Sequence, residues 1–357
     1  MSRKKNKWLR QPPDRSKIIF FLCFCLPPLL LYLLFGVYPI LNSVYVSLFE
    51  WSGFDKLTSD AFVGLGNYFE VITEEEFLCA IRNDFIIILG KEIIIIALTV
   101  LFAVSLTRLK FRKGESSLYR FVFFIPNVLS VVIISIIWTF VIDPNFGILN
   151  PVLRAVGLAD LIPASGWTYE HPLGVITFVA SWCGVGMFML IMIAAINGIN
   201  AEMYESATID GANEWKQLRY ITLPAIREQS KFIVVTILYQ SFSSNFTMVQ
   251  AMLGSSVNSD SVVMGMFVYQ NSFDSQWPRV GYSYSAAVIM LVITAAVSLI
   301  VNRIMSGRRS VYDWRKKEKQ IERVSRSGGV PADHTYFSDF LERARRFSDC
   351  LGALHLA

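Results

Sequence analysis

Six long apolar segments divide the chain, and polar or charged stretches separate them. Each segment has about 20 residues, the length at which an α-helix crosses the hydrocarbon core of a bilayer. The segments cover approximately residues 18–40, 85–106, 121–142, 173–196, 232–253 and 283–304. This pattern predicts an all-α polytopic membrane protein with six transmembrane helices.

The composition supports the same class of protein. Hydrophobic residues make up 54% of the chain and charged residues only 17%, a balance that excludes an ordinary soluble domain. The first apolar segment is too long for the core of a signal peptide, so we interpret it as a retained membrane helix. Pro27 and Pro28 within this segment predict a kink or a delayed helix start.

Basic residues are distributed unevenly between the polar stretches. Residues 1–17, 107–120 and 197–231 and the C-terminal tail are rich in Lys and Arg, whereas the other three loops contain few. Basic loops remain on the cytoplasmic side, so both termini are expected in the cytoplasm. The predicted organisation is a basic N-terminal tail (1–17), a six-helix transmembrane domain (18–305) and a cytoplasmic C-terminal tail (306–357).

The role of the C-terminal tail stays open at this stage. Six apolar residues in it recur at helical spacing, namely Phe337, Phe340, Leu341, Ala344, Phe347 and Leu351. They form either an amphipathic helix on the membrane surface or on a partner, or part of a dispensable extension.

Residues that would support catalysis or metal binding are scattered. The five cysteines and three histidines form no cluster with metal-ligand spacing, so we expect no metal site and no enzyme active site. The phosphate-binding motif G-x-x-x-x-G-K-[ST] does not occur, so the chain is expected to bind no nucleotide cofactor.

Two features inside the apolar segments need an explanation. Lys91 and Glu92 are charged, and charges in a membrane helix are unfavourable and often mark function. The simpler alternative is that both lie near the outer end of the helix, where Lys91 extends to the interface and Glu92 pairs with it or with another helix. Gly184 and Gly186 are expected to permit close helix packing.

The segment 202–224 is a polar island between the fourth and fifth apolar segments. Asn200 can cap a first short helix, and Gly211 allows the chain to turn. Residues 212–220 can form a second short helix, which Pro224 is expected to end before it opens the next membrane helix. A short element with small residues on the cytoplasmic side suits docking into a groove on a partner, although a plain cytoplasmic loop is an equally simple interpretation.

The fifth apolar segment is unusually polar for a membrane helix. Polar side chains there require a cavity or another helix to face, and aromatic rings nearby can stack on sugar faces. The candidate substrate-pathway residues are Tyr239, Gln240, Phe242, Ser244, Asn245, Phe246 and Gln250, with Trp182 from the fourth segment. Hydrogen bonding between helices is the alternative role for the polar members.

The 202–224 segment also carries a spaced motif. Glu205, Ser206 and Ala207 are followed by Gly211, and then, after nine residues, by Ile221, Leu223 and Pro224. This spacing resembles the EAA loop of ABC importer permeases, with serine in place of the usual second residue, alanine. Further stretches resemble the sugar-permease, maltose-permease-like branch of that family, at residues 64–68, 77–83, 119–138, 143–150 and 281–287. The chain departs from the family at Asn83–Asp84, where Asn-Thr is usual, and at Lys91–Glu92.

The resemblance implies that residues 18–305 form a permease domain with the type I ABC importer fold, in the inner membrane of a bacterial cell. It also implies a set of partners. These are a second, similar permease, two ATP-binding subunits that hold ATP and magnesium, and an extracellular solute-binding protein. The residues implied to couple to the ATPase are Glu205, Ser206, Ala207, Asp210, Gly211, Ala212, Ile221, Leu223 and Pro224. The implied cargo is a carbohydrate. Glycerol phosphate or another polar solute, and an ion-driven secondary transporter, are the alternatives.

Overall fold

The computed structural model describes residues 15–108, 114–274 and 277–305. The chain divides into two units, Met1–Val301 and Asn302–Ala357, and the description below concerns the first of them. The amphipathic pattern predicted in the C-terminal tail and most of the basic N-terminal tail lie outside the described residues.

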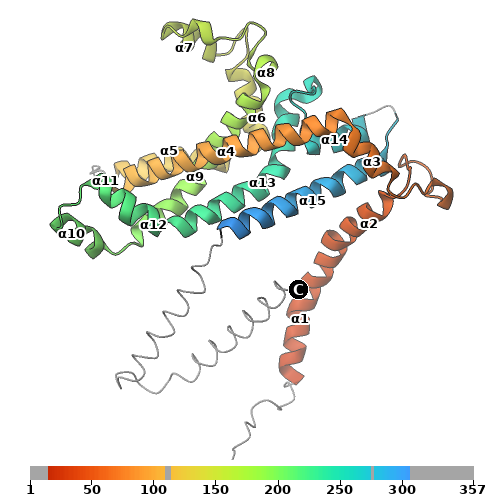
Figure 1. The fold of residues 1–357 in the computed structure, drawn as a ribbon, viewed down its shortest axis with the longest axis horizontal. Coiled ribbons are helices and arrows are strands. Elements are labelled where there is room, and N and C mark those ends of the chain that lie inside the picture. Colours follow the sequence, from red (N-terminus) through yellow and green to blue (C-terminus); the bar gives the residue numbers. More distant parts are fainter. Residues whose placement is uncertain (1–14, 109–113, 275–276, 306–357) are drawn as a thin grey trace, which may run out of the picture. The chain divides into compact units, whose positions relative to one another are not determined.

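The described part of the chain is helical, apart from loops and one isolated bridge between Phe49 and Phe62. This confirms the all-α prediction. The helices, shown in Figure 1, are α1 (Arg15–Tyr32), α2 (Tyr38–Val46), α3 (Gly66–Thr73), α4 (Glu75–Arg108), α5 (Glu115–Val128), α6 (Val131–Val141), α7 (Leu149–Ala155), α8 (Trp167–Glu170), α9 (Pro172–Asn197), α10 (Ala201–Ile209), α11 (Glu214–Gln217), α12 (Leu223–Ala225), α13 (Arg227–Leu253), α14 (Met264–Tyr269) and α15 (Val280–Met305).

Membrane-spanning helices match the six apolar segments, with one correction. Five helices in the described residues are long and apolar enough to cross a membrane, and α5 and α6 make a sixth if the bent pair is counted as one span. The third segment was predicted as one helix, but α5 and α6 meet at a bend of 101°. Leu129 and Ser130 are extended at the break, three residues after Pro126. Proline removes a backbone donor and weakens the helix around it. The helix is therefore interrupted here, although the hydropathy along the segment is not.

The prolines of the first span lie inside a continuous helix. α1 continues through Pro27 and Pro28, so a delayed start there is wrong. The helix instead widens into a π-helical turn at Leu33–Val37 before α2 begins. Large apolar side chains along this span are exposed in the isolated chain, as expected of a helix that faces lipid or a partner subunit.

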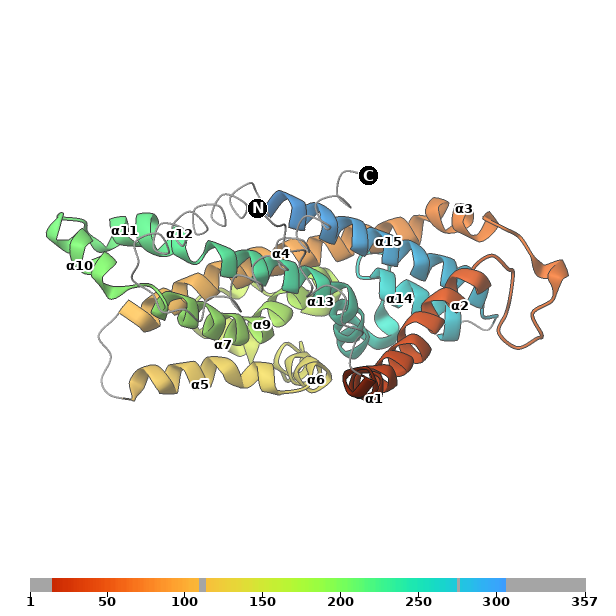
Figure 2. The same cartoon turned by 90° about the horizontal axis from the view of Figure 1, so that it is seen from below.

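Close contacts between α4, α9 and α5 build the centre of the bundle. A Cβ added at Gly184 would lie 2.9 Å from Ile95 of α4, and one at Gly186 would collide with the Phe123 carbonyl oxygen of α5. This confirms the prediction that the two glycines permit close packing. The view in Figure 2 shows α5 and α6 beside α9.

α3 is fastened to the loop that follows α2 and to the start of α15. Asn67 donates hydrogen bonds to the carbonyl oxygens of Ser47 and Phe49, both at 2.9 Å. Arg279, just before α15, forms a bidentate ion pair with Glu70 of α3, with both N–O distances at 2.6 Å. Its guanidinium also lies 4.2 Å from the ring centroid of Tyr282. These contacts hold α2, α3 and α15 together.

The Glu70–Arg279 pair makes stability depend on pH in acid. The hydrogen-bonded guanidinium holds the pKa of Glu70 below its ordinary value of 4.5. The ion pair therefore stabilises the folded chain above that range, and its contribution is lost as the pH falls through the lowered pKa. We expect the unfolding temperature of the detergent-solubilised protein to drop more steeply on acidification than that of Glu70→Gln. Both side chains are nearly half exposed, so the difference will be small; parallel curves for the two proteins would contradict this.

Candidate functional site

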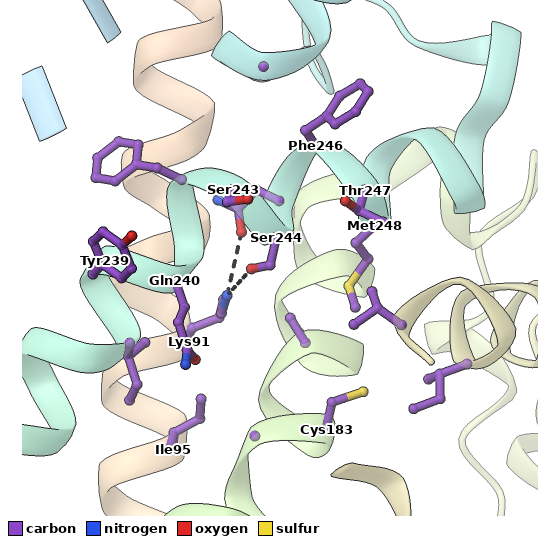
Figure 3. Close-up of a pocket in the computed structure, with 18 of the residues that line it drawn as sticks. Lys91, Ile95, Cys183, Tyr239, Gln240, Ser243, Ser244, Phe246, Thr247 and Met248 are labelled. Atoms are coloured by element: carbon purple, nitrogen blue, oxygen red, sulfur yellow. Dashed lines mark hydrogen bonds between the residues drawn. The ribbon is translucent and has the colours of Figure 1, made fainter. Parts of the chain in front are cut away.

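A cavity of about 870 Å³ lies between α4, the α5–α6 bend, α9, α13, α14 and α15. Figure 3 shows side chains of α13 facing Lys91 of α4 and Cys183 of α9 across this space. Apolar residues from the surrounding helices form the rest of the wall, among them Ile95, Ile134, Phe188, Met248 and Met290. A cavity of this size falls in the range that accommodates organic ligands.

The polar face of α13 supplies most of the hydrogen-bonding groups in the cavity. Among the candidate pathway residues, the lining includes Tyr239, Gln240, Phe242, Ser244, Asn245 and Phe246. Ser243 and Thr247, polar residues of the same apolar segment, also line it. Hydroxyl and amide groups alternate here with aromatic rings, and the wall can therefore offer both hydrogen bonds and apolar faces.

Gln250 and Trp182 lie outside the lining. Trp182 packs edge to face on Trp138, with ring centroids 5.6 Å apart, and is largely directed away from the cavity. The side-chain oxygen of Gln250 is buried and has no hydrogen-bond partner among the described residues. Both positions were selected because they are polar or aromatic within an apolar segment, a criterion that does not specify which face of the helix they occupy.

A chain of hydrogen bonds connects the cavity wall to α14. Lys91 Nζ lies 3.4 Å from Ser244 Oγ and 3.5 Å from Asn245 Oδ1. Asn245 Nδ2 donates to Asp84 Oδ1 at 2.8 Å, and the Met264 N–H donates to Asp84 Oδ2 at 2.9 Å. Asp84 is fully buried. The carboxylate therefore joins α4, α13 and the first residue of α14.

The structure corrects the simpler interpretation of Lys91 and Glu92. They lie in the middle of α4 rather than near its outer end, and only 6% of Lys91 and 9% of Glu92 is exposed. Lys91 faces α13 and the cavity, so it does not extend to the interface. Neither carboxylate oxygen of Glu92 has a hydrogen-bond partner among the described residues.

Sequence reasoning did not identify Asp84 as part of this site. The second apolar segment was taken to begin at residue 85, whereas α4 begins at Glu75. Asn83 and Asp84 are therefore helical residues whose polar groups are buried against the chain around Val262 and Met264. The adjacent Asn83 and Asp84, immediately before an apolar run, are the feature of the sequence that could have indicated a buried polar site.

The 202–224 segment folds largely as predicted. Asn200 caps α10 by accepting a hydrogen bond from the Glu202 N–H at 3.1 Å, and Gly211 turns the chain with φ of +76°. The second helix is shorter and more irregular than predicted, because α11 gives way to a π-helical turn at Leu218–Thr222. Pro224 lies inside α12 and does not end helical structure; the long membrane helix begins at Arg227.

The surface of this segment is open and partly apolar. Glu205, Ser206, Asp210, Gly211, Leu223 and Pro224 are exposed, and Ala207, Ala212 and Ile221 are half-buried. Four large apolar side chains that the motif does not include are exposed on the same segment, namely Met203, Ile209, Trp215 and Tyr220. Exposed apolar groups close together are typical of an interaction surface.

Three side chains fasten the segment to the end of α4. We call them the Thr222 junction. Arg108 Nη2 donates to Thr222 Oγ1 at 2.7 Å, and the Tyr204 hydroxyl lies 3.0 Å from the same oxygen. The Arg108 guanidinium lies 4.6 Å from the Tyr204 ring centroid, and Thr222 is fully buried. The junction connects α4, α10 and the turn that leads to α12.

Replacing Thr222 by valine keeps the shape but leaves Arg108 and Tyr204 without their shared oxygen. Leaving these half-buried donors without a partner lowers the stability of the folded segment by about 1–3 kcal/mol. We expect amide hydrogen exchange in α10 and α11 to become about tenfold faster or more. Thr236→Val is the matched control, because Thr236 bonds only to the Phe232 carbonyl of its own helix at 2.7 Å. Equal exchange in both variants would mean that the junction does not hold the segment.

Comparison with known proteins identifies the class that this fold and surface define. Residues 95–310 match the family described as "binding-protein-dependent transport system inner membrane component". The chain is 32% identical to the probable ABC transporter permease YurN of Bacillus subtilis, over 80% of this chain and 96% of that protein. The chain therefore belongs to the binding-protein-dependent transport permease family, as a multi-pass membrane component rather than a catalytic subunit.

Other relatives and a solved structure agree with this membership. The chain is 29% identical to the diacetylchitobiose uptake permease NgcF of Streptomyces coelicolor, over 88% of this chain and 91% of that protein. A bacterial ABC transporter that imports the acidic polysaccharide alginate has the same fold, with a TM-score of 0.68 at 20% identity over 82% of this chain and 96% of that one. These findings confirm the type I importer permease fold.

Proposed function

We propose that this chain is the transmembrane subunit of an ABC importer that carries an uncharged carbohydrate into the cytoplasm. The observation that carries the proposal is the cavity, where the α13 groups Gln240, Ser243, Ser244, Asn245 and Thr247 lie among aromatic rings. A sugar needs donors and acceptors for its hydroxyls and flat apolar surfaces for its ring faces. Tyr239, Phe242 and Phe246 supply those surfaces beside the polar groups.

The names of several relatives support a carbohydrate cargo. They include the diacetylchitobiose permease NgcF, the multiple sugar-binding transport permease MsmF of Streptococcus mutans and the arabinooligosaccharide permease AraP of Halalkalibacterium halodurans. The solved alginate importer also has a structure in complex with a periplasmic protein that holds an alginate pentasaccharide. A solute-binding protein is accordingly a proposed partner of this chain, together with a second permease.

Energy reaches the cavity through residues 202–224 in this proposal. We assign the Arg108 end of α4 to the cytoplasm, in keeping with its basic loops. One of two ATP-hydrolysing subunits then contacts the motif residues, which are Glu205, Ser206, Ala207, Asp210, Gly211, Ala212, Ile221, Leu223 and Pro224. The exposed apolar side chains of Ile209, Trp215 and Tyr220 enlarge the contact. ATP and its magnesium are held in those subunits, and their closure moves the permease by rigid-body rotation.

A glycerol phosphate or other anionic cargo fits the cavity less well. Lys91 is the one Lys or Arg among the described lining residues, and Asn245 links it to the buried Asp84 carboxylate. A phosphate group usually meets several cationic or backbone N–H donors. The wall therefore favours a cargo that binds through neutral hydroxyl or amide groups.

Uptake by the reconstituted complex tests this function. The permease pair, its ATPases and the neighbouring binding protein are placed in proteoliposomes with ATP inside, and radiolabelled uncharged oligosaccharides and glycerol 3-phosphate are offered outside. We expect ATP-dependent accumulation of at least one oligosaccharide and none of the phosphate. Accumulation of glycerol 3-phosphate alone would overturn the carbohydrate assignment.

A further inference from the structure

Lys91 is buried in the middle of a membrane helix yet borders the cavity. Its ammonium carries three donors, and its two hydrogen bonds, to Ser244 and Asn245, are 3.4 and 3.5 Å long. Good N–H···O hydrogen bonds lie between about 2.7 and 3.2 Å. The ammonium is therefore incompletely bonded by the protein, in a place where an unsatisfied charge is strongly unfavourable.

The charge of Lys91 is balanced from the protein side. Asn245 stands between the ammonium and the buried carboxylate of Asp84, accepting from one and donating to the other. Asp84 and Lys91 are seven residues apart, two turns along the same face of α4. Glu92, the next residue, adds a second buried carboxylate to this part of the helix. Because Asp84 already lies near the ammonium through Asn245, an anionic ligand gains less from Lys91 than it would from a cation without a counter-charge.

We propose that Lys91 is a specificity-determining residue of the cavity, and that its ammonium binds a hydroxyl or carbonyl oxygen of an uncharged sugar. A ligand oxygen at normal hydrogen-bond distance supplies the partner that Ser244 and Asn245 provide only weakly. Donors that carry a charge form hydrogen bonds about twice as strong as neutral ones. The flexible lysine stem lets the ammonium follow oxygens at different positions on the sugar. This inference rests on the proposed carbohydrate function.

Cys183 provides a reporter that does not require transport. This thiol lines the same cavity, on α9 across from α13, and is free. In a complex where the other cysteines of this chain and the accessible ones of its partners are replaced, a bound sugar will slow the reaction of Cys183 with N-ethylmaleimide. The probes are maltotriose, N,N′-diacetylchitobiose and arabinotriose as uncharged sugars, with trigalacturonate and glucose 6-phosphate as anionic ones.

We expect an uncharged sugar to protect Cys183 and the anionic probes to protect it much less. In Lys91→Met, half-protection should require about ten times more sugar, the loss of one charge-assisted hydrogen bond. Lys91→Arg keeps the charge and is expected to retain most of the protection. Lys56→Met is the matched control, because Lys56 is exposed in the loop before α3 and does not border this cavity.

The double variant Asp84→Asn/Lys91→Met covers the case in which Lys91→Met does not fold. It removes both charges while keeping side chains of similar size, and it should show the same loss of protection. Equal protection in wild type and in these variants would overturn the role of Lys91 while leaving the carbohydrate function intact. Stronger protection by an anionic probe would overturn the proposed preference. Failure of every uncharged sugar to protect the wild-type complex would instead count against the proposed function itself, and against this inference with it.

Discussion

Replacing Gly211 by valine is expected to abolish ATP-dependent uptake while the protein still inserts in the membrane. Gly211 has φ of +76° and follows α10 in a Schellman turn. The Ala212 N–H donates to the Ala207 carbonyl at 2.8 Å, and the Gly211 N–H to the Thr208 carbonyl at 3.0 Å. A β-branched residue is strained in this conformation by about 1–2 kcal/mol or more. The turn will open and shift Glu205 and Ala207, the residues proposed to contact the ATPase, without touching the membrane core.

Gly157→Val is the matched control for this variant. Gly157 also has a positive φ, of +80°, and like Gly211 has no atom near the position of an added Cβ. It lies after α7, away from the 202–224 segment. Both variants should be present in the membrane at similar levels, with uptake lost only in Gly211→Val. Loss of uptake in both would show that a strained turn anywhere impairs the protein, and normal uptake in both would remove the coupling role from this turn.

Replacing Gly186 by valine is expected to destabilise the bundle itself. A Cβ at this position would overlap the Phe123 carbonyl oxygen and lie 2.9 Å from the Phe124 Cα. Both are backbone atoms, so α5 and α9 must separate before the side chain fits. Overpacking that side chains can relieve by moving lowers the free energy of unfolding by about 1–3 kcal/mol. A collision with backbone atoms cannot be relieved in this way, so the loss is expected to be larger. Measured by thermal unfolding in detergent, Gly186→Val should unfold at least about 5 °C below wild type.

Gly174 on the same helix supplies the comparison for Gly186. Its nearest neighbour for an added Cβ is the Cβ of His171, at 4.0 Å. Gly174→Val therefore carries the same change in helix propensity without the collision. If the two variants unfold at the same temperature, the close approach of α5 and α9 contributes nothing to stability.

The membrane spans could be predicted because their length and hydropathy are properties of each segment alone. The break between α5 and α6 could not, since Pro126 marks a weak point in the run but does not specify a bend of 101°, and α6 packs against α9 and α13, which are distant in sequence. The early start of α4 was missed for a related reason. Asn83 is polar, but its amide is buried by donating to the Val262 carbonyl at 2.9 Å, a partner distant in sequence.

The candidate site was predictable to the same extent. Polar residues in the fifth apolar segment indicated a cavity, because a membrane helix tolerates them only where they face water, ligand or another helix. Which of them face it depends on the rotation of α13, and Gln250 fell outside. Lys91 was assigned to an interface because its depth was counted from residue 85, whereas α4 begins at Glu75 and places it mid-helix.

α4 has 34 residues and carries the Thr222 junction at one end, Lys91 at its middle and Asp84 toward the other end. An α-helix of this length measures about 50 Å, so a tilt of about 5° displaces its far end by about 4 Å. Because α4 is bonded to Thr222 at Arg108, a rotation of the 202–224 segment tilts the whole helix about that end. Lys91 lies midway along α4, about 25 Å from Arg108, so the same tilt moves it by about 2 Å. A shift of that size breaks hydrogen bonds that are already 3.4 and 3.5 Å long, so a small rotation at the Arg108 end is sufficient to exchange one set of cavity contacts for another. No relay of side chains is needed, because the backbone of one helix spans the distance.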